Sequence, residues 1–170
     1  LIFDAVASVS GLYFTDKDLD PWELGGAFSW QAPAATARVV GYRLYMATST
    51  AGAKKLQLRE DVAVGTNNLD VLPETPISPF TNLVVYTHSS LTEQTTPTQM
   101  PIVDTVAMVG AIQFEDQDLD ETELGGTLMW SEPADTAQVA HYSHWLIYTL
   151  SSLVEQTTPA THQIYDMISQ

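Results

Sequence analysis

The stretch Phe14–Trp30 reads FTDKDLDPWELGGAFSW, and one hundred positions later Phe114–Trp130 reads FEDQDLDETELGGTLMW. The offset of 100 (114 − 14) holds over the whole segment Asp4–Tyr42 of the first copy. A register of this length predicts a tandem repeat whose unit is about one domain long.

The composition limits what such a repeat can do. A chain of 170 residues with 45% hydrophobic residues can bury a core, so global disorder is not expected. The net charge of −15 repels phosphate backbones and anionic lipids, which argues against nucleic-acid binding and favours cations or basic partners. No apolar run is long enough to insert into a membrane, and the absence of cysteine rules out disulfides and thiolate metal sites.

The apolar residues occur in short, β-branched and aromatic bursts separated by turn-forming residues, which indicates an all-β fold. A turn is expected at Gly52–Lys55 and a Pro-rich crossover at Pro73–Phe80. Trp30 and Trp130 are expected in the core. In the first copy the expected strands are Val6–Phe14, Ala27–Gln31, Val39–Ala47, Leu56–Val64, Asn68–Leu72, Thr81–His88 and Met100–Val103. Seven or so strands at this spacing are typical of a sandwich.

Two of these segments resemble fibronectin type III domains. Trp30 is followed by Pro33 and then by VVGYRLY at Val39–Tyr45, and PFTNLVVY at Pro79–Tyr86 is similar to the approach to the sixth strand of that family, with Leu83 where the family usually has Tyr. The resemblance implies immunoglobulin-like β-sandwiches.

The fuller pattern combines the Asp-rich loop, Glu-Leu-Gly-Gly, the Trp and the later YTxSSLxEQTTP sequence. This combination is similar to tandem repeats in large extracellular or surface proteins of unicellular algae and related protists. The similarity implies an extracellular or cell-surface location.

The second copy is shorter than the first. VYTHSSLTEQTTP at Val85–Pro97 returns as IYTLSSLVEQTTP at Ile147–Pro159, an offset of 62, so 38 residues (100 − 62) are missing between Ser143 and Ile147. We expect repeats at 1–104 and 105–166, and the start of a possible third repeat at 167–170.

The shortened stretch has no Gly, Pro or Asn that could turn the chain, so without the missing segment two strands would fuse across Tyr142–Tyr148. We therefore predict a segment that exists in the molecule but is absent from this sequence. The alternative is a shortened half-domain that a neighbour's strands complete.

The Asp-rich loops are the candidate metal sites. Carboxylates at alternate positions can wrap around Ca²⁺, although the loops lack the Gly and the final acid of an EF-hand. The alternative is a solvated acidic turn whose Asp side chains cap their own backbone amides. The candidate Ca²⁺ ligands are Asp16, Asp18, Asp20 and Glu23, and in the second copy Asp116, Asp118, Asp120 and Glu123.

Two features beside the loops have alternative interpretations. Gly25-Gly26 and its counterpart predict a bulge or positive φ where a strand enters the sheet, because no Lys or helix follows for phosphate binding. Trp22 has Thr122 as its counterpart, so it could stack on a sugar or a neighbouring domain, or cap the end of its own sandwich.

The sequence gives little support for catalysis. The four His residues lack a metal-binding set, and no nucleophile elbow is present, so we do not expect an enzyme. The Thr-Pro stretches could carry O-linked glycans or could protect strand edges.

The expected function is a structural or adhesive segment of an extracellular filament or appendage, whose partners are neighbouring repeats and copies of itself. The alternatives are a Ca²⁺-dependent carbohydrate- or protein-binding module, or an accessory domain of a secreted enzyme.

Overall fold

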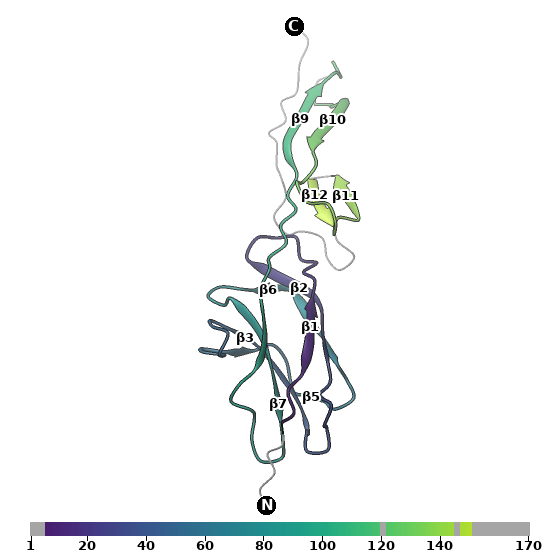
Figure 1. Ribbon diagram of the computed structural model, residues 1–170. Helices are drawn as coiled ribbons and strands as arrows, with labels where there is room; N and C mark the ends of the chain where they lie inside the picture. Colours follow the sequence, from purple (N-terminus) through teal and green to yellow (C-terminus); the bar gives the residue numbers. More distant parts are fainter. Residues whose placement is uncertain (1–5, 120–121, 145–146, 151–170) are drawn as a thin grey trace, which may run out of the picture. The chain divides into compact units, whose positions relative to one another are not determined.

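The computed structural model describes residues 6–119, 122–144 and 147–150, and in these residues it is all-β, with every strand pair antiparallel (Figure 1). The described residues form two compact units. The first unit contains the residues up to Asp16 together with Trp22–Asp104. The second contains Lys17–Pro21 and the residues from Thr105 onward.

The first unit has two sheets. One sheet has the order β1-β2-β6, and the other has the order β4-β3-β7-β8, with β5 pairing the far end of β3. The strands are β1 (Ser10–Phe14), β2 (Glu23–Gln31), β3 (Gly41–Ala47), β4 (Leu56–Gln57), β5 (Val62–Ala63), β6 (Asn68–Pro76), β7 (Asn82–His88) and β8 (Thr98–Pro101).

Side chains from both sheets share one core, which makes this unit β-sandwich-like. The core follows from alternation along the strands: in β3, Tyr42, Leu44 and Met46 are at most 1% exposed. In the other sheet Phe28 and Trp30 of β2 point the same way, and the Trp30 ring meets the Tyr42 ring edge-on at 5.4 Å between centroids.

Several predicted boundaries differ from the structure. β6 continues through the predicted crossover as far as Pro76, because an edge strand tolerates proline. The expected strand Leu56–Val64 is divided into β4 and β5, and β1 begins only at Ser10. β2 begins four residues before the predicted start, at Glu23.

The second unit contains two strand pairs in its described residues. β9 (Gly110–Asp116) pairs with β10 (Gly126–Ser131), and β11 (His141–His144) pairs with β12 (Ile147–Leu150).

The β11–β12 pair corrects one expectation. Tyr142 pairs with Thr149, just as Tyr42 pairs with Thr87 in the β3–β7 pair, so the chain reverses between β11 and β12 and no fused strand forms. The point where we predicted a missing segment includes residues 145–146, which lie outside the described residues, as does the possible third repeat at 167–170.

Trp130 was expected in a core, but it is 37% exposed, whereas Trp30 is 4% exposed. The ring contact is nevertheless similar, since Trp130 and Tyr142 lie edge-on at 5.6 Å. The difference follows from the sheet: β2 lies between β1 and β6, while β10 has β9 as its one strand neighbour among the described residues.

Candidate metal centre

The loop that joins β1 to β2 is held by its own carboxylates. The Asp16 Oδ1 atom accepts a hydrogen bond from the Gly25 amide at 2.9 Å, and the Asp18 Oδ1 atom accepts one from the Asp20 amide at 3.2 Å. The capping that we considered is therefore present. The three Asp residues are only 0–3% exposed, so this is not a solvated turn.

The backbone beside the loop has the bulge that the double glycine predicted. The β2–β6 register shifts between Leu24 and Gly26, and Gly26 has φ +146°. A Cβ at Gly26 would lie 2.6 Å from the Thr15 carbonyl oxygen, so only glycine fits without a shift of the backbone. Trp22 also has a positive φ of 74°. These features fix how the loop enters β2.

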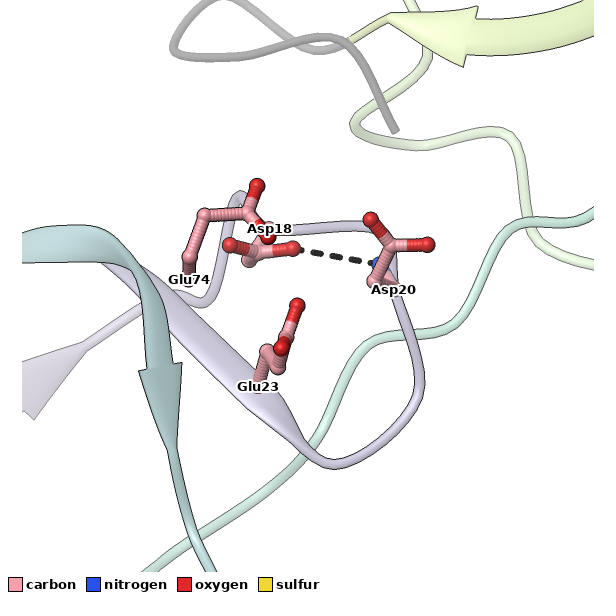
Figure 2. A group of neighbouring side chains, drawn as sticks. All are labelled: Asp18, Asp20, Glu23 and Glu74. Carbon is pink, nitrogen blue, oxygen red and sulfur yellow. Dashed lines mark hydrogen bonds between the residues drawn. The ribbon is translucent and has the colours of Figure 1, made fainter. Parts of the chain in front are cut away.

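Four carboxylates gather at this loop (Figure 2). Asp18, Asp20, Glu23 and Glu74 each place one oxygen so that all four oxygens lie within 4.8 Å of one another. Oxygen ligands from several carboxylates are what Ca²⁺ prefers, and a divalent cation would relieve the repulsion between such close negative charges. The cluster could hold a metal ion.

Sequence reasoning found three of these residues and missed Glu74. Glu74 is some fifty residues away in the chain and belongs to β6, where the pairing of Leu24 with Thr75 brings it near the loop. Its φ of 61° is unusual for a non-glycine residue. The spacing of acids within one loop cannot reveal a residue that arrives through strand pairing.

Asp16 also differs from the prediction in its role. Its carboxylate caps the Gly25 amide, and it is not one of the four clustered residues.

The second acidic loop repeats the cap. The Asp116 Oδ1 atom accepts hydrogen bonds from the Gly125 amide at 2.9 Å and from the Asp118 amide at 3.1 Å. Glu123 is exposed, and Asp120 lies outside the described residues. Within the described part of this loop no group of three acids comes together. A counterpart of Glu74 would fall in the 38-residue segment that the second copy lacks.

Trp22 is 69% exposed, so it does not cap its own sandwich by burying its ring, which corrects that interpretation. Its backbone amide donates a hydrogen bond to the Asp104 Oδ2 atom at 2.9 Å.

A second polar cluster, not predicted from the sequence, surrounds Glu93. Glu93 accepts a hydrogen bond from the Tyr45 hydroxyl at 2.7 Å and forms an ion pair with Lys55. The Lys55 ammonium lies over the Tyr45 and Tyr86 rings, 4.3 and 3.8 Å from their centroids. Burial by itself raises the pKa of Glu93, but the bonds from Lys55 and Tyr45 outweigh it, and the pKa is lowered overall.

Arg43 connects this cluster to Asp61. The guanidinium makes a bidentate contact with the Asp61 carboxylate, Nε donating to Oδ1 and Nη2 to Oδ2 at 2.9 Å each, and this contact lowers the pKa of Asp61. These partners satisfy one another, so we read the cluster as stabilising structure rather than as a binding site.

A scan against known protein families and a search of curated proteins found no match to this chain. No helix that is long and apolar enough to span a bilayer occurs among the residues that the structure describes.

Proposed function

We propose that the chain is a non-catalytic structural segment of a larger extracellular or cell-surface assembly, built from tandem β-sandwich repeats, and that its first acidic loop binds Ca²⁺. Its partners in this proposal are neighbouring repeats and copies of itself.

The tandem organisation is supported by matching geometry at matching positions. Trp22 and Thr122 have φ values of 74° and 71°. Gly25 and Gly125 donate equivalent 2.9 Å hydrogen bonds to the preceding Asp. Side chains as different as Trp and Thr do not by themselves impose the same rare backbone conformation, so a shared architecture is the simpler explanation.

The observation that carries the Ca²⁺ proposal is the cluster of four carboxylates. Asp18 and Asp20 are 0% and 1% exposed, and removing charged carboxylates from water is costly unless compensating charge is supplied. A bound cation would supply such charge in the folded state and would be lost on unfolding. Metal binding would thereby stiffen the loop beside β2.

The alternative function, Ca²⁺-dependent binding of a carbohydrate or protein, is favoured by one observation. Trp22 presents a 69% exposed ring directly beside the acidic loop, and exposed aromatic rings stack well on sugars. In that case Ca²⁺ would order the binding surface. An accessory role beside a secreted enzyme uses the same features.

The Ca²⁺ site is tested by thermal unfolding of the metal-stripped chain with and without added CaCl₂. Binding to the folded state at a concentration of about 100 times Kd should stabilise it by about 2.7 kcal/mol and raise Tm by several degrees. Asp18→Asn and Glu74→Gln should each reduce the Ca²⁺-dependent shift strongly.

The matched control is Asp70→Asn, which removes an exposed carboxylate from the same strand as Glu74 but outside the cluster. It should keep the full shift. Asp118→Asn shows whether the second loop contributes. Equal Ca²⁺ shifts in the wild type, Asp18→Asn and Glu74→Gln would disprove the site.

A further inference from the structure

A cavity opens at the end of the first sandwich where β1 begins. Its volume is about 520 Å³, and its wall comes from the segment before β1, the β2–β3 loop and the end of β7 with the turn that follows. Small apolar residues form much of this wall: Val6, Ala7, Ala35, Ala37 and Val39. The cavity lies within the first unit, so it does not arise from the 38 residues that the second copy lacks.

The cavity also offers a cation and a backbone donor. Arg38 is exposed and makes no ion pair among the described residues. The Ala7 carbonyl accepts a hydrogen bond from the Thr87 hydroxyl at 2.6 Å, but the Ala7 amide donates none to any residue that the structure describes. Glu93, the acid in the wall, is already paired with Lys55. A fitting ligand therefore brings an apolar side chain, a carbonyl oxygen and negative charge.

The second unit shows the same backbone donor in use. Ala107 occupies the position of Ala7, and its amide donates a hydrogen bond to the Leu19 carbonyl oxygen at 3.2 Å. Leu19 belongs to the acidic segment Lys17–Pro21, which is part of this compact unit. Ala107 and Leu19 are 1% and 0% exposed, whereas Ala7 is only half-buried. An Asp-rich loop therefore covers the segment that starts this repeat.

The matching loop of the second copy is not covered. Leu119 occupies the position of Leu19 but is 65% exposed. Leu19 is not part of the first sandwich's core, and its loop groups with the residues from Thr105 onward. The first-copy counterparts of the 38 missing residues belong to the other unit, so their loss does not explain why Leu119 is exposed. The chain thus has an open cavity in one copy and an uncovered loop of the fitting kind in the other.

We propose that the cavity before β1 receives the Leu119 loop of a second copy of the chain, just as the segment before β9 receives the Leu19 loop. The Leu119 side chain enters the apolar cavity, its carbonyl oxygen accepts a hydrogen bond from the Ala7 amide, and Arg38 attracts the Asp118 carboxylate. The inference rests on the proposed function, in which copies associate, and specifies the surfaces through which they do so.

Charge favours this occupant. With 6 basic residues against 21 acidic ones, two copies repel each other over most of their surfaces. Arg38 provides one of the few places where an acidic loop is attracted, and such complementarity fixes the orientation of the contact. The cavity and the loop are different surfaces, so the contact is heterologous and further copies can add at the open ends.

Sedimentation velocity of the whole chain at rising concentration, in EDTA and about 0.15 M NaCl, tests this inference. One loop in one cavity buries less surface than a standard interface, so each addition should have a Kd on the order of 10–1000 µM. Arg38→Glu in the cavity and Leu119→Ser in the loop should each raise this Kd by about tenfold or more.

Each variant has a matched control outside the contact. Arg59→Glu makes the same change of charge at another exposed arginine that does not line this cavity. Leu72→Ser removes a leucine of β6 that is 56% exposed. Both controls should associate like the wild type, and circular dichroism verifies that every variant is folded.

A mixture of the two contact variants identifies a head-to-tail contact. Arg38→Glu keeps an intact loop and Leu119→Ser keeps an intact cavity, so an equimolar mixture should form a dimer although neither variant associates alone. Growth should stop there, because the cavity and the loop left open in that dimer are both defective.

The outcomes separate the inference from the proposed function. If Arg38→Glu and Leu119→Ser associate as well as the wild type, the contact is wrong but self-association stands. A mixture that forms no dimer at concentrations where the wild type associates also overturns the contact alone. A wild type that stays monomeric up to about 1 mM overturns both self-association and this inference.

Discussion

Glu93 shows how one side chain can stabilise the outer face of a sheet. Its carboxylate contacts both Tyr45 of β3 and Lys55 in the β3–β4 turn. The Arg43 Nη1 atom lies 3.6 Å from the Glu93 Oε2 atom, which also accepts the Tyr45 hydrogen bond. Its side chain is 17% exposed, so these contacts are partly shielded from water. A charge-assisted network of this kind is expected to be measurable in stability.

Glu93→Gln should lower the free energy of unfolding by about 1–2 kcal/mol at pH 7, because it removes the charge but preserves the shape. Since the folded state lowers the pKa of Glu93, the stabilisation is present above the unfolded value of about 4.3 and is lost as pH falls through the folded value. Urea unfolding between pH 7 and pH 3 should therefore show wild type and variant converging in acid. Parallel curves would contradict this role.

Gly26 is a second residue whose identity is set by its surroundings. Gly26→Ala forces a Cβ towards the Thr15 carbonyl oxygen and should cost about 1–3 kcal/mol, measured by urea unfolding. The matched control is Gly110→Ala, where the added Cβ meets nothing within 4 Å and a change within about 0.5 kcal/mol is expected. Equal costs at the two positions would show that the bulge tolerates a side chain.

At the scale of elements, the sequence predicted strand bounds best for the strands at the centre of the core. β3 was predicted within two residues of its ends because Tyr42, Leu44 and Met46 alternate with other residues, and β7 because it is a short run that is buried almost throughout. The division into β4 and β5, and the extension of β6 through Pro73, could not be predicted. Edge strands receive less packing from neighbours, and their composition then says little about pairing.

The same distinction holds for the candidate metal centre. Asp18, Asp20 and Glu23 could be predicted because they share one loop, whereas Glu74 depends on the register of β2 with β6. That register includes a shift at Gly26, which sequence spacing does not specify. The three residues that share the loop could therefore be predicted from the sequence. Glu74, which strand pairing brings to the site, could not.

The number of strand neighbours also explains why two equivalent tryptophans should contribute differently to the free energy of unfolding. Trp30→Ala should destabilise the first unit by about 3–5 kcal/mol, since it empties a position between two sheets. Trp130→Ala should cost about 1–2 kcal/mol, because its ring is 37% exposed. Chemical unfolding followed by circular dichroism measures both. A larger cost at Trp130 would contradict the exposure of β10.

At the scale of the whole molecule, charge opposes compactness. The 21 acidic residues outnumber the 6 basic ones, and the folded chain concentrates this excess. The ion pairs described above involve few of these acids and are partly shielded from water, so salt weakens them only slightly. The effect of salt on stability should therefore come mainly from screening of the repulsion among the excess acidic residues.

Raising NaCl from about 10 mM to 0.5 M should therefore increase Tm of the metal-stripped chain, because the Debye length falls from about 30 Å to only a few Å. Differential scanning calorimetry in EDTA, at a concentration where the chain is monomeric, measures this effect without metal binding or association. Ca²⁺ at millimolar concentration adds little ionic strength, so any rise in Tm that it gives beyond an equal ionic strength of NaCl reports site binding. A fall in Tm with NaCl would mean that specific ion pairs, rather than net charge, control the stability of this acidic chain.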